Sequence, residues 1–196
     1  MMSLFPIGLT GGMGSGKSTV SRILQSHGFD IIDADQISRL TCRMPETAQQ
    51  LMAAFGQDLY DAPRGIPELD RPLLARRAFA SDNSRQMLND IMHPAMKKTA
   101  VQMLNAAQNP AILDAPLLFE AGWDALVKTT IAVLCPLETR IQRIVQRDHL
   151  EPDQIMARIR AQIDDYEKRA DILFYNTGDP DALRQQVTKW LRIISN

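Results

Sequence analysis

Eight residues near the start of the chain have the types and the spacing of a phosphate-binding loop. Residues 11–18 read Gly-Gly-Met-Gly-Ser-Gly-Lys-Ser, which satisfies the pattern GxxxxGK[ST]. Glycines at these positions let consecutive backbone N–H groups point inward around a phosphate. Lys17 adds a positive charge at the β- and γ-phosphates, and the Ser18 hydroxyl is placed to bind Mg²⁺. An apolar run precedes the loop and a helical pattern follows it, so the sequence predicts a nucleotide-binding site here.

Two acidic residues stand at the ends of apolar runs, where ligands of open α/β sheets gather. Asp33 ends one run, and we expect it either to accept a proton from an attacking hydroxyl or to help hold a metal. Asp114 ends another, and such an acid holds Mg²⁺ directly or through water. The alternative for Asp114 is an acid that begins a turn before Pro116. Asp35 is interpreted as the cap of the next helix.

Three arginines share one face of a predicted helix. Arg140, Arg143 and Arg147 are three and four residues apart, so their guanidinium groups lie on the same side. An exposed charged stripe is the ordinary interpretation, but three arginines so placed could also close over phosphates. His93, which precedes Pro94 at the start of a predicted helix, has no second metal ligand nearby.

Short apolar runs that alternate with helical patterns must position these groups. Five runs are predicted strands, and a helix from about Ser18 to His27 follows the first; such alternation indicates a parallel sheet covered on both faces. Asp179 and Pro180 mark the start of the last helix. The fold class is therefore α/β, doubly wound. The five predicted strands are Leu4–Thr10, Phe29–Asp33, Ala111–Leu113, Thr130–Leu134 and Ala170–Phe174.

The long interval from Ala34 to Pro110 carries no strand pattern, and we expect substrate contacts there. A turn-rich piece, residues 61–67, interrupts its helical stretches. A second helical region, Leu137–Arg169, lies between the fourth and fifth predicted strands. The helical stretches between Ala34 and Pro110 are predicted around Glu46–Phe55, Arg71–Phe79, Arg85–Met92 and Pro94–Asn109.

Length and composition exclude several classes of protein. The 196 residues allow one compact unit with elaborations, and a net charge of −1 excludes a polybasic nucleic-acid coat or an acidic tail. Cys42 and Cys135 are far apart and are expected to be reduced thiols. The first residues do not read as a signal peptide, and no apolar stretch is long enough to span a bilayer. We expect a soluble, cytoplasmic protein with no nucleic-acid or membrane partner.

Among proteins with this loop, a small-molecule kinase fits best. The chain has no Asn-Lys-x-Asp signature, which disfavours GTPases, and no Leu-Ser-Gly-Gly-Gln stretch, which disfavours transporter ATPases. It is also short for a AAA-type motor.

Several segments, in order and at family-like spacing, closely resemble dephospho-CoA kinases. The opening residues 7–20 carry the first match, and the resemblance extends over nearly the whole chain. In many members glutamine stands where this chain has Arg140, and the Gly65–Arg71 connection here is slightly longer than usual. The other matching segments are Ile32-Asp33-Ala34-Asp35, Leu69-Asp70-Arg71 with Leu74 and Phe79, His93-Pro94, Asp114-Ala115-Pro116-Leu117-Leu118-Phe119-Glu120, Arg143 with Arg147, Ala161-Gln162, and Ala170-Asp171 with Asn176.

This resemblance implies ATP-dependent phosphorylation of the ribose 3′-hydroxyl of dephospho-CoA, which gives CoA and ADP in the last step of CoA biosynthesis. It implies a single P-loop kinase domain over residues 1–196 with Mg²⁺ as cofactor. A helical acceptor-binding insertion is expected at about 61–109 and a mobile lid at about 137–168. The oligomeric state does not follow from the sequence.

The resemblance also implies a role for each site residue. Asp33 is the general base, and Lys17 and Arg143 complete the catalytic set; Ser18 and Asp114 hold the metal. Arg71 and His93 lie by the acceptor. The ATP-binding set is Gly11, Gly12, Met13, Gly14, Ser15, Gly16, Lys17, Ser18, Thr19, Arg147 and Asn176.

Two alternatives remain open at this stage. A related P-loop kinase that acts on a nucleotide or a small alcohol would share the loop and Asp33, and a panel of acceptors would distinguish it. A regulatory module that binds nucleotide without turnover would release no ADP when an acceptor is added.

Overall fold

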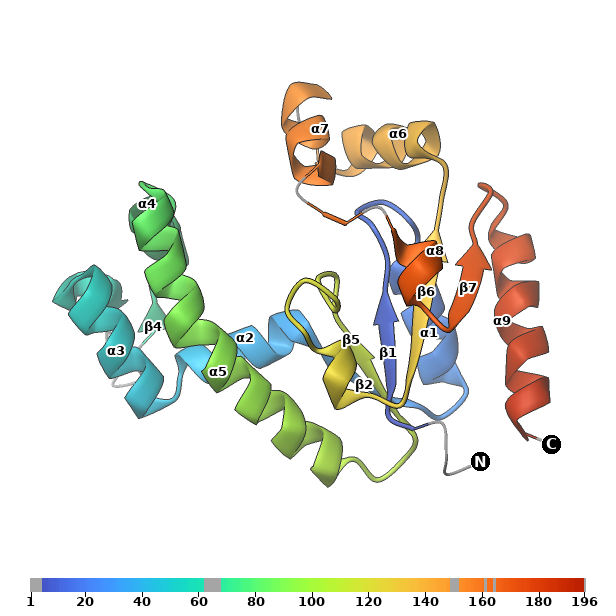
Figure 1. The fold of residues 1–196 in the computed structure, drawn as a ribbon, viewed down its shortest axis with the longest axis horizontal. Helices are drawn as coiled ribbons and strands as arrows, with labels where there is room; N and C mark the ends of the chain where they lie inside the picture. Colours follow the sequence, from blue (N-terminus) through green and yellow to red (C-terminus); the bar gives the residue numbers. More distant parts are fainter. Residues whose placement is uncertain (1–4, 62–67, 149–151, 161, 164, 196) are drawn as a thin grey trace. The chain divides into compact units, whose positions relative to one another are not determined.

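The computed structural model describes residues 5–61, 68–148, 152–160, 162–163 and 165–195. The chain folds as two compact units (Figure 1). Unit 1 consists of Met1–Asp33 and Ala106–Asn196, and unit 2 of Ala34–Asn105. Unit 2 begins earlier than the insertion expected at 61–109, because the helices directly after Asp33 already belong to it.

Unit 1 is built on a five-stranded sheet whose neighbouring strands all run parallel, in the order β2-β5-β1-β6-β7. The predicted α/β fold is thus confirmed. Each of the five predicted strands is present, with ends shifted by up to three residues. The strands are β1 (Ile7–Thr10), β2 (Asp30–Asp33), β5 (Ala111–Asp114), β6 (Thr129–Leu134) and β7 (Ile172–Tyr175).

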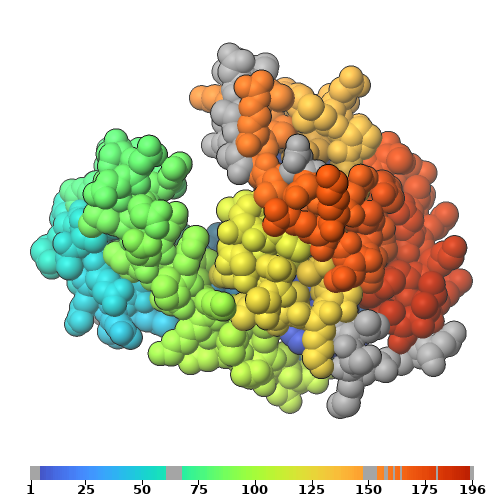
Figure 2. All heavy atoms as spheres, viewed as in Figure 1, coloured from blue at the N-terminus to red at the C-terminus, as the bar shows by residue number. Residues whose placement is uncertain are grey.

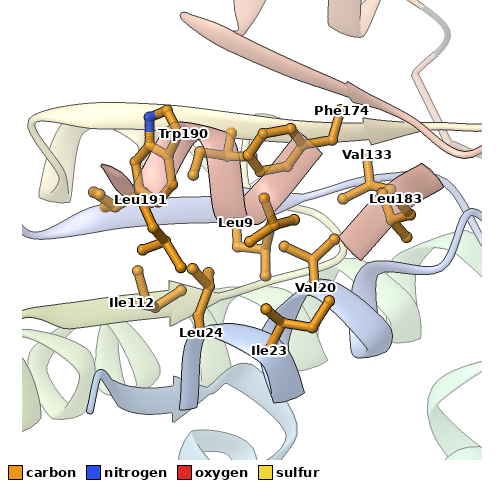
Figure 3. Close-up of a cluster of buried hydrophobic side chains, with 13 residues drawn as sticks. Leu9, Val20, Ile23, Leu24, Ile112, Val133, Phe174, Leu183, Trp190 and Leu191 are labelled. Atoms are coloured by element: carbon orange, nitrogen blue, oxygen red, sulfur yellow. The ribbon is translucent and has the colours of Figure 1, made fainter. Parts of the chain in front are cut away.

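One face of the sheet packs against α1 (Lys17–Ser26) and α9 (Pro180–Ser195). Side chains from the strands and from both helices interdigitate there (Figure 3). Leu9 and Val133 supply strand residues to this core, and Trp190 packs edge-on against Phe174. The outer face of α9, red in Figure 2, lies at the surface of unit 1. The predicted start of α9 is confirmed: Asp179 accepts a hydrogen bond from the Asp181 N–H at 2.9 Å.

The opposite face is covered by a smaller cluster. Side chains alternate along β6, so Ile131 and Val133 enter the first core while Ala132 packs with Phe119 and Tyr166. Tyr166 begins the short helix α8 (Tyr166–Arg169), which lies in front of β6 in Figure 1. A 3₁₀ turn, η2 (Asp124–Leu126), precedes β6.

Two helices lie beyond the carboxyl ends of the strands of unit 1 (Figure 1). They are α6 (Leu137–Asp148) and α7 (Pro152–Arg160), and both belong to the segment expected to form a lid. Ile144 is fully buried on α6, whereas the arginines of this helix lie toward or at the surface.

Unit 2 is mostly helical and has its own apolar cluster, which includes Leu51, Phe55 and Leu74. Arg77 of α4 (Arg71–Ala78) supports the end of α3 (Pro45–Phe55) by donating to the Phe55 carbonyl and to the Asp58 carboxylate. Its elements are α2 (Ala34–Cys42), α3 (Pro45–Phe55), η1 (Gln57–Leu59), β3 (Tyr60–Asp61), β4 (Glu68–Leu69), α4 (Arg71–Ala78) and α5 (Asp82–Ala106).

Three sequence-based expectations for unit 2 are wrong. The interval contains two strands, because β3 and β4 pair antiparallel over two residues each, too short for an apolar pattern. The two helices predicted on either side of His93 are one helix, so His93 lies inside α5. Pro94 removes one backbone donor, yet α5 continues because buried residues such as Met92 and Ala100 hold it on both sides. Asp35 lies in the first turn of α2 instead of before it.

Candidate active site

The phosphate-binding loop joins β1 to α1 and is held in a defined conformation. The Ser15 N–H donates to the Gly12 carbonyl at 3.0 Å, which closes a turn. Gly14 and Gly16 have φ angles of +78° and +98°, a left-handed conformation that side chains disfavour. Because α1 begins at Lys17, the positive end of the helix dipole faces the loop. The predicted nucleotide-binding geometry is therefore present.

Three of the expected functional side chains come together at the carboxyl edge of the sheet. Asp33 and Asp114 are paired residues of neighbouring parallel strands, so they end β2 and β5 side by side. The Lys17 ammonium forms an ion pair with the Asp114 carboxylate. Asp114 is only 4% exposed, so Lys17 neutralises a charge that would otherwise be buried alone. Asp33 is half-buried beside this pair.

The donor atoms at this edge suit Mg²⁺. Ser18, exposed in the first turn of α1, supplies a hydroxyl, and Asp114 supplies a carboxylate. Mg²⁺ in nucleotide enzymes takes one or two protein oxygens and completes its shell with phosphates and water. Within the described ranges, no group of three or more His, Cys, Asp or Glu side chains forms a metal site.

Helix α6, which carries the three arginines, contacts the backbone of the loop. Arg140 Nε donates to the Met13 carbonyl at 2.8 Å, and Arg143 Nη1 donates to the Gly14 carbonyl at 3.3 Å. Arg147, one turn further along α6, is exposed. The first two arginines thus meet the nucleotide loop in the structure, while the third lies at the surface.

Asn176 connects α6 to the loop from the other side. It is 5% exposed; its amide nitrogen donates to the Ser15 carbonyl at 2.8 Å, and its oxygen accepts from Arg143 at 3.1 Å. A Cβ on Gly16 would collide with the same amide, which is a second reason for glycine there. The resemblance assigned Asn176 to the ATP-binding set, and its contact with the loop was not predicted, because 161 residues separate Asn176 from Ser15.

A further loop contact comes from the segment after α7. The Met13 N–H donates to Gln162 Oε1 at 2.8 Å. The Ile163 N–H donates to Glu120 Oε1 at 3.1 Å, which anchors this segment to the sheet unit. Sequence reasoning assigned Gln162 no role, although the Ala161-Gln162 pair was among the segments that resembled the family.

Beside the loop, unit 1 contains a pocket of about 430 Å³. Burial lowers the pKa of the Arg140 guanidinium and raises the pKa of the Tyr166 phenol to about 12. The pKa of the Cys135 thiol is raised, again chiefly by burial. The pocket lies between the carboxyl ends of β6 and β7, the start of α6 and helix α8. Its lining includes Gly12, Ser15, Cys135, Arg140, Ile163, Tyr166, Tyr175, Asn176 and Thr177.

A second pocket, of about 370 Å³, lies within unit 2 and brings together two predicted acceptor residues. Arg71, at the start of α4, and His93, inside α5, both line it. The remaining wall is largely apolar and includes Leu74, Phe79, Met92 and Met96.

Two polar side chains are associated with the unit 2 pocket: the buried Cys42, which lines it, and the half-buried Tyr60, which is hydrogen-bonded to Cys42. The Tyr60 hydroxyl donates to the Cys42 carbonyl at 2.7 Å, and burial raises the pKa of Tyr60 to about 12. Burial also raises the pKa of the Cys42 thiol, which lines the pocket and contacts the Met92 sulfur. Cys42 and Cys135 are both free thiols, as expected.

None of the described helices has the length and apolar character needed to cross a bilayer.

Comparison with known proteins agrees with this geometry. The family model described as dephospho-CoA kinase matches residues 5–181. A dephospho-CoA kinase of Corynebacterium glutamicum is 40% identical over 190 residues, which cover 93% of this chain and 94% of that protein. Two solved structures are similar over nearly the full length. TT1252 from Thermus thermophilus has a TM-score of 0.80 and a sequence identity of 32%, and the match covers 97% of both chains. A dephospho-CoA kinase from Campylobacter jejuni has a TM-score of 0.66 and a sequence identity of 27%, and the match covers 96% of both chains. The chain belongs to the dephospho-CoA kinase family.

Proposed function

We propose that this protein transfers the γ-phosphoryl group of ATP to the ribose 3′-hydroxyl of dephospho-CoA, giving CoA and ADP. One observation carries the proposal beyond family membership: Asp33 and Asp114 end adjacent strands beside Lys17 and the phosphate-binding loop. This edge provides a base, a metal-binding carboxylate and a phosphate-binding cation, which are the groups that phosphoryl transfer requires.

The loop and Lys17 bind the phosphate chain of ATP. Backbone N–H groups of residues 11–19 and the start of α1 supply oriented donors, and Lys17 supplies charge. Because Lys17 contacts Asp114 in the structure, nucleotide binding requires the lysine to share its charge between the carboxylate and the phosphates.

Ser18 and Asp114 are the residues that would hold Mg²⁺. When bound, the metal would neutralise charge on the transferring and leaving phosphate oxygens. Asp33 is the general base: it accepts the proton of the 3′-hydroxyl as the new oxygen–phosphorus bond forms and the bond to the β-phosphate oxygen of ADP breaks.

The pocket of unit 2 supports binding of the acceptor. Dephospho-CoA combines an adenosine, a diphosphate and a long pantetheine chain, so it presents anionic and apolar surfaces together. Arg71 fits a phosphate, His93 can hydrogen-bond to the nucleoside, and the apolar wall suits the uncharged parts.

The segment 137–168 is proposed as the lid, with Arg147 as a nucleotide phosphate ligand on α6. The contacts of Arg143 with the Gly14 carbonyl and with Asn176 support a positioning role for this arginine. The resemblance implied a catalytic role for this arginine, as a lid residue near the phosphates. Water exclusion during transfer gives such a closing segment its function.

The proposed enzyme works in the cytoplasm, on ATP and dephospho-CoA, without a nucleic-acid or membrane partner. Two free thiols suit a reducing compartment.

Release of ADP with a panel of acceptors tests this proposal. We expect ADP formation only with ATP, Mg²⁺ and dephospho-CoA. Equal rates with AMP or shikimate would indicate a different small-molecule kinase, and nucleotide binding with no acceptor-dependent ADP would indicate a regulatory module.

A further inference from the structure

Arg140 is a cation fixed at the edge of the nucleotide loop. Its Nε donates to the Met13 carbonyl at 2.8 Å, and its side chain is half-buried. The guanidinium lies against Gly12 so closely that a Cβ there would collide with the terminal nitrogens. The Nε atom of Arg140 is therefore hydrogen-bonded to the loop, and the two terminal nitrogens, Nη1 and Nη2, lie beside the loop backbone at Gly12.

No acidic side chain in the described ranges forms an ion pair with this guanidinium. The nearby acids have other contacts: Glu120 accepts from the Ile163 N–H, and Asp165 pairs with Arg169. Glu167, which also lines the pocket, is exposed and accepts from the Tyr175 hydroxyl at 3.5 Å. Partly buried charges in proteins are normally paired, so this arrangement favours an anionic ligand.

Arg140 also lines the pocket of about 430 Å³, together with two buried hydroxyls that have no partner in the described part of the chain. Ser15 is 1% exposed and Tyr166 is 4% exposed, and neither Ser15 Oγ nor Tyr166 Oη forms a hydrogen bond there. Buried hydroxyls of this kind are rarely left unsatisfied, which indicates that the pocket receives a polar ligand.

We propose that the two terminal nitrogens of Arg140 bind a phosphate oxygen of the nucleotide held by the loop, while its Nε keeps the Met13 carbonyl in place. The ligand is a nucleoside di- or triphosphate, and in that respect the inference rests on the proposed function. Arg140 would then act at once as a phosphate ligand and as a residue that positions the loop. The planar guanidinium suits this double task, because its donors lie in a fixed fork.

The variants Arg140→Gln and Arg140→Met separate these two tasks. The amide nitrogen of glutamine stands at the same number of bonds from the backbone as Nε of arginine, so R140Q can keep the hydrogen bond to Met13. It lacks the terminal nitrogens and the positive charge of the guanidinium. Methionine has a similar length and no donor, so R140M loses both interactions. Arg184, exposed on α9, provides R184Q as a control with the same change of charge.

Calorimetric titration with ATP, ADP and adenosine, in the absence of any acceptor, measures the effect. For R140Q we expect affinity for ATP and ADP to fall about tenfold to a hundredfold, the range for a hydrogen bond to a charged group. Affinity for adenosine should change less than about twofold, and R184Q should match the wild type. R140M should bind ATP no better than R140Q. The unfolding temperatures of all variants establish that they are folded.

Wild-type ATP affinity in R140Q would overturn the proposal. If R140M then lost affinity, Arg140 would only position the loop; if R140M also kept wild-type affinity, Arg140 would do neither task. An equal loss for adenosine and ATP would overturn it too. Because no acceptor is present, failure here leaves the kinase assignment intact. A wild-type protein that binds ATP but makes no CoA would contradict the assignment instead.

Discussion

At the scale of single residues, one lysine at the carboxyl edge of the sheet has two tasks. Lys17 neutralises the nearly buried Asp114 carboxylate and is also the proposed ligand of the ATP phosphates. The motif predicted the second task only. The ion pair adds a stability cost to any substitution of this lysine, because the remaining carboxylate is left without its partner.

Lys17→Ala should therefore lower both activity and stability. We expect kcat to fall by about 10²-fold or more, by analogy with loss of a preorganised donor. Leaving Asp114 unpaired should lower the free energy of unfolding by about 1–3 kcal/mol. Steady-state kinetics and denaturant unfolding measure the two effects. The double variant Lys17→Ala/Asp114→Asn should regain stability but no activity; independent, additive losses of stability would show that the pair is not coupled.

Asp33→Asn should affect chemistry far more than binding. The amide keeps the size of the carboxylate but cannot accept the proton of the hydroxyl, so kcat should fall by about 10²–10⁴-fold. ATP affinity should change by less than about tenfold. Single-turnover kinetics together with ATP titration separate the two quantities. A large loss of Mg·ATP affinity with an intact chemical step would assign Asp33 to the metal.

Asp35→Asn is the matched control for Asp33. Asp35 is exposed in the first turn of α2, where a carboxylate interacts favourably with the helix dipole. Its loss should cost about 0.3–1 kcal/mol of stability and little rate. If Asp35→Asn proves the more damaging of the two, the choice of base is wrong.

At the scale of secondary-structure elements, Asn176 connects the end of β7 to both the loop and α6. Its amide donates to the Ser15 carbonyl, and its oxygen accepts from Arg143 and from the Gly178 N–H. Asn176→Ala should cost about 1–3 kcal/mol, because these buried groups lose their partner. ATP affinity should fall with it, since the loop loses a support. Thermal unfolding with and without ATP tests this expectation; an unchanged unfolding temperature in the apo protein would contradict it.

The elements that sequence reasoning recovered are those with strong local patterns. Buried parallel strands read as apolar runs, and Asp179-Pro180 is a helix start that needs no tertiary information. The hairpin of β3 and β4 was missed because two-residue strands carry no periodicity. The single helix α5 was missed because Pro94 normally ends a helix, and only tertiary packing around Met92 and Ala100 outweighs that tendency.

The candidate site divides in the same way. The loop follows one apolar strand pattern, and Asp33 and Asp114 end two others. These positions can be recognised in the sequence, so Lys17, Asp33 and Asp114 were predicted together. The contacts of Arg140 and Gln162 with Met13 join residues 127 and 149 positions apart. No local pattern encodes such pairs, because they depend on how the segment after β6 returns over the loop.

At the scale of the whole molecule, the half-buried Tyr60 and the buried Tyr166 report on the stability of the two units at high pH. Burial raises the pKa of Tyr60 in unit 2 and of Tyr166 in unit 1 to about 12, against about 10 in an unfolded chain. The folded state holds these protons longer. Their contribution to stability is therefore complete below about pH 10 and is lost as the pH rises toward about 12.

Denaturant unfolding between about pH 9 and pH 12 should show this decline in stability, and Tyr60→Phe and Tyr166→Phe should each make it less steep. The chain has a third tyrosine, Tyr175, so the difference in phenolate absorbance between the wild type and each Phe variant gives the independent measure of these two groups. Ionisation of both tyrosines near pH 10 in the folded protein would contradict the burial seen in the structure.

The most direct test of the central claim is the identity of the product formed from ATP and dephospho-CoA. Mass spectrometry should show one added phosphoryl group and an equal amount of ADP, and phosphorus NMR should place the new phosphate on the ribose 3′-hydroxyl. Asp33→Asn, assayed beside the wild type, should yield the same product far more slowly. Unmodified dephospho-CoA, or a phosphate at another position, would contradict the assignment.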